Sequence, residues 1–155
     1  MANWTGMARS NYVRVKDPQA FKDFVDCFPA QLIEREKDGE MLYGFYSLDD
    51  GMIPALHQHD ADDQFMTACS LAGINPDTLD TVDPERVLIT EMIHRFLAHG
   101  ETLIVIEAGN EKARFVGATA LAIHYDGGCS QIDLLSDIMR GAKERWGGKP
   151  TVPIT

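Results

Sequence analysis

The pattern of apolar and polar residues predicts a central β-hairpin between Glu101 and Tyr125. Leu103 to Ile106 is apolar and rich in β-branched residues, which is typical of a buried strand. Gly109-Asn110 favours a turn, because both residues tolerate positive φ. A second apolar run, from Phe115 to Ile123, ends before Asp126-Gly127-Gly128. We therefore expect two antiparallel strands in the middle of a sheet.

Three further strands are expected in the first third of the chain. Asn11 to Lys16 alternates polar residues with valines, which predicts a half-buried strand. Two strand-like runs, Gln31 to Lys37 and Glu40 to Ser47, flank Asp38-Gly39, and this dipeptide is a strong hairpin signal. Residues 52–60 show no clear period, so we expect a loop there.

Four helices are predicted from apolar residues spaced three and four positions apart. The first begins at Asp17-Pro18, an N-cap followed by proline at the first helical position, and runs to Phe28. The second covers residues 61–73, the third runs from Asp83-Pro84 to Gly100, and the last extends from Ser130 to Gly147-Gly148. The residues expected on their apolar faces are Phe21, Phe24, Val25 and Phe28, then Phe65, Met66, Cys69 and Ala72, then Val87, Leu88, Met92 and Phe96, and finally Ile132, Leu135, Ile138 and Met139.

This order of elements indicates an α+β fold, with an antiparallel sheet of about five strands and helices packed against it. The chain has 155 residues and no internal repeat or clear domain boundary, so we expect one domain covering residues 1–155. Residues 49–91 form an acidic, insert-like segment within it. No apolar run approaches the ~20 residues that span a bilayer, and the N-terminus has no secretory signal pattern. Three widely spaced cysteines favour free thiols in the host bacterial cytoplasm.

The charge distribution gives the strongest functional signal. The net charge is −10, and residues 49–91 hold ten acids and one base, Arg86, for a net charge of −9. Such a segment repels phosphates, which argues against direct nucleic-acid binding and in favour of a basic surface on a partner protein. An ordinary solvated surface is the competing explanation. The residues expected to contact the partner are Asp49, Asp50, Asp60, Asp62, Asp63, Asp77, Asp80, Asp83 and Glu85.

The sequence also contains two candidate sites for enzyme chemistry. His57, His59 and the aspartates at 60, 62 and 63 are suitable metal ligands, although the aspartates also fit the first turn of a helix. No second ligand pair occurs at a characteristic spacing, so we predict no metal or other cofactor. Cys129 follows two glycines and precedes a predicted helix, a position that can lower a thiol pKa. We assign no catalytic residue from the sequence.

Two short segments resemble small uncharacterised proteins encoded on bacterial plasmids, prophages and related mobile elements. The segment from Ala8 to Asp17, ARSNYVRVKD, is similar to their ARSNYFRVKD-like start. The segment from Glu107 to Phe115, EAGNEKARF, is similar to their EAGxEKxRY pattern, and Asp49-Asp50-Gly51 falls where those proteins have an acidic glycine turn. Residues 52–83 are longer than the short link expected from those proteins, so the resemblance does not account for this acidic segment. The resemblance implies an accessory or counter-defence role, of the anti-CRISPR or antirestriction kind.

These observations favour a non-enzymatic inhibitor that binds a host CRISPR or restriction component through its acidic surface. The first alternative is a small metal-dependent or thiol enzyme that uses the His57/His59/Asp cluster or Cys129. The second is a homo-oligomeric accessory protein, such as a homodimer, that self-associates through strand edges or through Trp4 and Met7. No membrane partner is expected.

Overall fold

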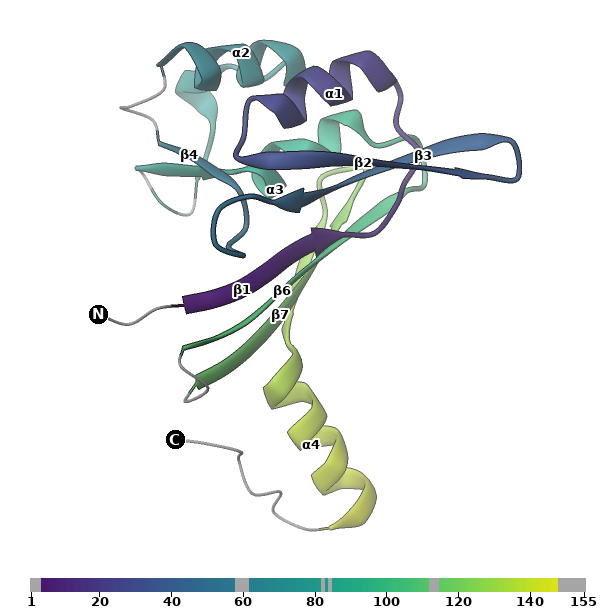
Figure 1. Cartoon of the computed structure of the whole chain (residues 1–155), viewed down its shortest axis with the longest axis vertical. Helices are drawn as coiled ribbons and strands as arrows, with labels where there is room; N and C mark the ends of the chain where they lie inside the picture. The colour runs from purple at the N-terminus through teal and green to yellow at the C-terminus, as the bar shows by residue number, and fades with distance from the viewer. Residues whose placement is uncertain (1–3, 58–61, 82, 84, 112–114, 148–155) are drawn as a thin grey trace.

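Six strands form one antiparallel sheet in the computed structural model, with the order β2-β3-β1-β6-β7-β8 (Figure 1). A separate two-stranded ribbon, β4-β5, lies beside the helices (Figure 1). The structure describes residues 4–57, 62–81, 83, 85–111 and 115–147. The α+β prediction is confirmed, and the expected sheet of about five strands has six. The elements are β1 (Trp4–Ser10), α1 (Pro18–Asp26), β2 (Ala30–Lys37), β3 (Glu40–Ser47), β4 (Ala55–His57), α2 (Asp62–Ala72), η1 (Pro76–Thr78), β5 (Arg86–Leu88), α3 (Ile89–Met92), η2 (Ile93–Phe96), β6 (Thr102–Glu111), β7 (Phe115–His124), β8 (Cys129–Asp133) and α4 (Leu134–Trp146).

Strand β1 joins the two halves of the sheet. It pairs with β6 along its whole length, from Trp4 opposite Glu111 to Ser10 opposite Val105. Its pairing with β3 is limited to Arg9 opposite Tyr46. The sheet therefore consists of the β2–β3 hairpin and the β6–β7–β8 meander, connected through one N-terminal strand.

The prediction of a strand from Asn11 to Lys16 is wrong, because the chain leaves the sheet after Asn11. Asn11 itself still binds β6 through its backbone and its side chain: its N–H donates to the Ile104 carbonyl at 2.9 Å, its Oδ1 accepts from the Ile104 N–H at 2.8 Å, and its Nδ2 donates to the Thr102 carbonyl at 3.3 Å. The following residues form only isolated bridges, at Val13 and Val15. The valines of the alternating pattern thus point inward without belonging to a ladder.

Helix α1 and the β2–β3 hairpin form as predicted, because their signals are local. The Asp17 carboxylate accepts from the N–H groups of Gln19 and Ala20 and so caps the first turn of α1. At the hairpin, Asp38 and Gly39 have φ of 53° and 81°, the left-handed conformations that a two-residue hairpin turn requires.

The core lies between the inner face of the sheet and the short helices. All four residues of the predicted α1 stripe are buried, and Phe24 stacks on Phe96 with ring centroids 4.4 Å apart. Phe21 contacts Tyr43 and Phe96 edge-on. This aromatic cluster therefore ties α1 both to β3 and to η2.

Several predicted boundaries are corrected by pairing between distant segments. The third helix is replaced by β5 and the short α3 and η2, because β5 pairs with β4 inside the segment expected as a loop. The last helix begins at Leu134, since residues 129–133 form edge strand β8 on β7. Strand β6 runs through Gly109-Asn110, which is not the turn, and Gly109 pairs with Gly117. Two residues expected on apolar helix faces are exposed: Met66 on α2 and Ile132 on β8.

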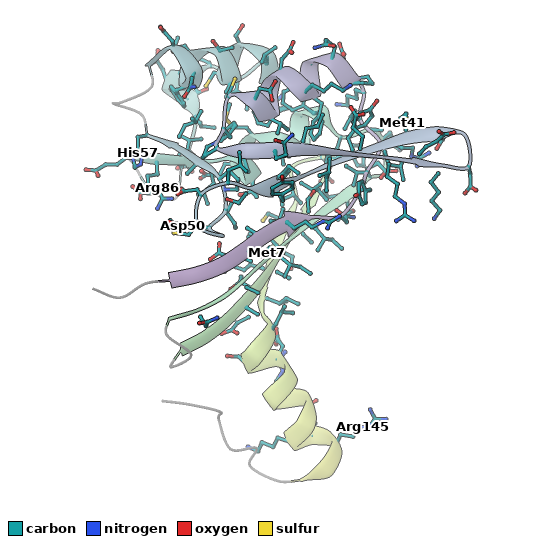
Figure 2. The ribbon with its side chains drawn as sticks, in the orientation of Figure 1. Met7, Met41, Asp50, His57, Arg86 and Arg145 are labelled. Carbon is teal, nitrogen blue, oxygen red and sulfur yellow. The ribbon has the colours of Figure 1, made fainter. Side chains whose placement is uncertain are left out.

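Helix α4 extends away from the rest of the fold, and Arg145 lies near its far end (Figures 1 and 2). Its main contacts among the described residues are with β7 and β8. Leu135, Ile138 and Met139, expected on its apolar face, have side chains outside the described set. Among the described helices, none is long and apolar enough to cross a membrane.

Candidate functional site

The acidic segment folds against the sheet and presents most of its described carboxylates to solvent. Asp49 is half-buried in the turn after β3. Asp60 lies outside the described residues, as does the side chain of Asp62, the first residue of α2. The exposed acids of the segment are Asp50, Asp63, Asp77, Asp80, Asp83 and Glu85.

The described cations do not neutralise these six exposed acids. The ion pairs seen in the described part of the chain are Arg14–Glu101, Lys22–Glu34 and Arg140–Asp137. Arg86, the base of the acidic segment, lies on β5 opposite His57 (Figure 2), and its Nε is buried without a hydrogen-bond partner. The surface of this segment therefore keeps a strong negative potential.

A groove between α1 and α2 adds two acids that sequence reasoning missed. Its volume is about 220 Å³, and Asp23 and Asp26 of α1 line it together with Asp63 of α2. The signal for these residues was the polar side of α1, opposite the phenylalanine stripe. Only the packing of α1 against α2 shows that they extend the acidic segment.

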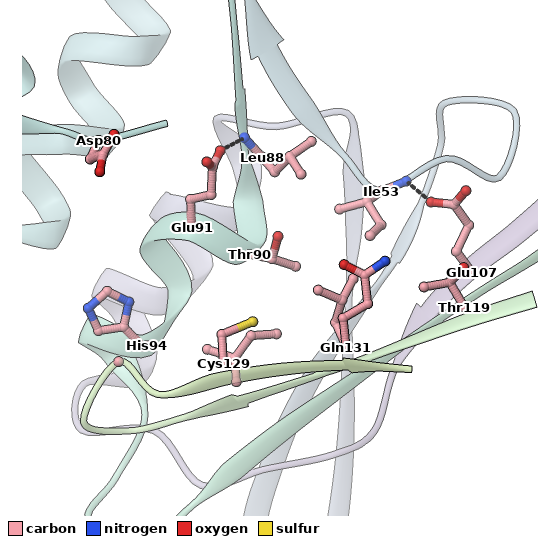
Figure 3. Close-up of a pocket in the computed structure, with 13 residues that line it drawn as sticks. Ile53, Asp80, Leu88, Thr90, Glu91, His94, Glu107, Thr119, Cys129 and Gln131 are labelled. Atoms are coloured by element: carbon pink, nitrogen blue, oxygen red, sulfur yellow. Dashed lines mark hydrogen bonds between the residues drawn. The ribbon is translucent and has the colours of Figure 1, made fainter. Parts of the chain in front are cut away.

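A larger cavity, of about 530 Å³, lies between the inner face of β7–β8 and the segment that contains α3 and η2 (Figure 3). Apolar side chains form part of its wall, and polar side chains from five separate segments of the chain line it. The carboxylates in its lining are those of Asp80, Glu91 and Glu107, and His94 is the histidine among its described lining residues.

Two of the cavity carboxylates are fixed by backbone hydrogen bonds (Figure 3). Glu91 Oε2 accepts from the Leu88 N–H at 2.7 Å, as in a capping box at the start of α3. Glu107 Oε2 accepts from the Ile53 N–H at 3.1 Å and so joins β6 to the chain that leads into β4. Both carboxylates thus have defined positions before any ligand arrives.

His94 and Cys129 line the same cavity but do not form a nucleophile–base pair. Burial lowers the pKa of His94, and the nearby cations Arg95 and Lys16 lower it further, against a smaller opposing effect of Asp126. The imidazole is therefore neutral at pH 7. In Figure 3 the Cys129 sulfur is directed away from the His94 ring. Cys27 and Cys69 are buried, and Cys69 was expected on the apolar face of its helix.

Most of the metal cluster considered from the sequence lies outside the described residues, which leave His59, Asp60 and the side chain of Asp62 undescribed. His57 is exposed at the end of the short strand β4. Within the described part of the chain, no group of three or more His, Cys, Asp and Glu side chains could hold a metal ion.

The outer face of the sheet carries exposed apolar side chains. Met7 is 66% exposed, and Ile104 and Ile106 are 41% and 46% exposed. With Arg9 and Ala108 they line a shallow apolar groove of about 420 Å³ along β1 and β6. Met7 therefore has the exposure that self-association would need, whereas the side chain of Trp4 is outside the described set.

Comparisons with known proteins assign no family to this chain. No protein-family model, no curated protein and no solved structure matches it.

Proposed function

We propose that this protein is a non-enzymatic inhibitor that binds a basic, nucleic-acid-handling surface of a bacterial defence protein. The observation that supports the proposal is the set of exposed carboxylates on residues 50–85, none of them neutralised by a described cation. Carboxylates on a folded surface offer a basic groove the same charge as nucleic-acid phosphates, and they speed association at low salt. The resemblance of the segments Ala8–Asp17 and Glu107–Phe115 to mobile-element proteins agrees with this role.

The acidic surface has two parts on this proposal. The groove set consists of Asp23, Asp26 and Asp63, from two packed helices. The loop set consists of Asp77, Asp80 and Asp83, around η1 and the approach to β5. Each exposed carboxylate that pairs with a partner cation contributes about 0.2–1 kcal/mol, so a set of three contributes roughly tenfold in affinity.

The test begins with a tagged protein that captures its target from host lysate at low salt and releases it at high salt. The captured protein, bound to labelled DNA or RNA, is then titrated with this chain, and displacement is followed by fluorescence anisotropy. We expect the groove set or the loop set, changed to asparagine, to weaken displacement about tenfold and to flatten its salt dependence.

The matched control removes the same charge from another place. Glu36→Gln, Asp38→Asn and Glu40→Gln neutralise three exposed acids on the β2–β3 hairpin, and asparagine keeps the left-handed conformation at position 38. This variant should displace nucleic acid as well as the parent protein does. If the hairpin control weakens binding as much as both test sets, net charge alone acts and the proposed surface is wrong.

A further inference from the structure

We infer that the 530 Å³ cavity is a binding site for a small organic cation, an ammonium or guanidinium group on an apolar body. This site is distinct from the acidic surface proposed above and shares only Asp80 with it. The inference rests on three properties of the cavity: its size, its apolar wall and the sign of its charged groups.

The size and wall suit a small molecule. Ligand pockets in proteins are typically about 300–1,000 Å³ and combine a mostly apolar lining with a few placed polar groups. Ile53, Leu88, Leu121 and Ile123 supply the apolar wall of this cavity. A volume of about 530 Å³ exceeds what one protein side chain would fill, which favours a free molecule over a side chain of a partner.

The charged groups select a cation. Asp80, Glu91 and Glu107 face the cavity from three separate segments, and no lysine or arginine is found among the described residues that line it. The one histidine of the lining, His94, is neutral at pH 7 and adds no positive charge. Thr119 and Gln131 supply neutral hydrogen-bonding groups beside the carboxylates. An anionic ligand would meet only repulsion from these carboxylates.

The backbone contacts of Glu107 show how the cavity could orient such a ligand. One oxygen is held by the Ile53 N–H at 3.1 Å, which fixes the carboxylate next to an apolar side chain of the wall. A cation that contacts this carboxylate therefore places its apolar body against Ile53 and Leu121. This arrangement distinguishes a site for an amphipathic cation from a general acidic surface.

Three probes of similar shape test the inference: phenethylamine as the cation, 2-phenylethanol as the neutral analogue and 3-phenylpropionate as the anion. Binding is measured by NMR titration of the full chain. The exposed thiol of Cys129 gives a second readout through its rate of reaction with a disulfide reagent, since Cys27 and Cys69 are buried. We expect saturable binding of phenethylamine with Kd on the order of 1 mM, and slower Cys129 modification.

Variants locate the binding within the cavity. Glu107→Gln removes the charge and keeps an acceptor for Ile53, so it should weaken phenethylamine about tenfold and leave 2-phenylethanol unchanged. Gln131→Trp, at an exposed position on β8, should fill the cavity and remove binding of both probes. Glu36→Gln, an exposed acid on β2 that lies outside the cavity and outside the proposed acidic surface, is the control. Equal affinity for all three probes, no saturation at roughly ten times the expected Kd, or insensitivity to Gln131→Trp would overturn the inference.

Discussion

The turn formed by Asp49, Asp50 and Gly51 should be one of the least replaceable parts of the fold. Gly51 has φ of +78° and lies directly against the backbone of β1. A Cβ at this position would lie 1.9 Å from the carbonyl carbon of Gly6 and 2.3 Å from the amide nitrogen of Met7. Neither atom can move without disturbing the pairing of β1 with β6. Gly51→Ala therefore combines a conformational penalty with a steric one.

Two other glycines separate these penalties. Gly39 has φ of +81° and nothing within 4 Å of an added Cβ, so Gly39→Ala isolates the conformational term of about 1 kcal/mol. Gly44 has an ordinary φ, but its Cβ would lie 2.6 Å from the Asn11 carbonyl oxygen, so Gly44→Ala isolates a clash of about 1–3 kcal/mol. All three substitutions stiffen the unfolded chain equally, and this effect cancels in their comparison.

The expected loss for Gly51→Ala is about 2–4 kcal/mol, the sum of both terms. With a urea m-value of about 2 kcal/mol/M, the unfolding midpoint should fall by roughly 1–2 M, against about 0.5 M for Gly39→Ala. Urea unfolding followed by tryptophan fluorescence and far-UV circular dichroism measures both midpoints. Equal midpoints for the two variants would refute the close contact between this turn and β1.

Two further predictions concern single side chains. Ser10→Ala should lower the free energy of unfolding, measured by urea unfolding, by about 1–3 kcal/mol. The buried Ser10 hydroxyl accepts from the Phe45 N–H at 2.9 Å, and this donor would lose its partner. A loss no larger than that from replacing an exposed serine by alanine would contradict this role. The lowered pKa of His94 means that the unfolded chain binds more protons than the folded one below the ordinary value of 6.5. The free energy of unfolding should therefore decrease as the pH falls from about 7.5 to about 5.5, and His94→Gln should lose part of this dependence. Urea unfolding of both chains across this pH range measures the effect, and identical pH profiles would contradict the role of His94.

The parts of the fold that sequence reasoning recovered are those with local causes. Asp17 and Pro18 specify the start of α1 through a side-chain cap and a fixed φ, and Asp38-Gly39 specifies a hairpin through left-handed backbone. The segments that were missed depend on distant partners. Arg86 to Leu88 is extended because it pairs with β4, and a helical pattern with an N-cap signal at Asp83 cannot reveal that pairing.

The candidate site likewise has one part that the sequence predicts and another that only the structure shows. The negative charge of residues 49–91 is visible in the sequence, and the structure leaves most of its described acids exposed. The acids of α1 join this surface only through helix packing, and Glu107 reaches the cavity from a strand in another third of the chain. Neither grouping has a sequence spacing that could have predicted it.

The place of β1 in the sheet also has a consequence for the order of folding. Trp4 pairs with Glu111, so the strand that joins both halves of the sheet leaves the ribosome long before its main partner, β6, has been made. Contacts this distant in sequence close slowly, and an unpaired strand that carries Met7 is exposed to other chains during that time. The β2–β3 hairpin and α1 form from neighbouring residues, so they can fold before β1 pairs with β6.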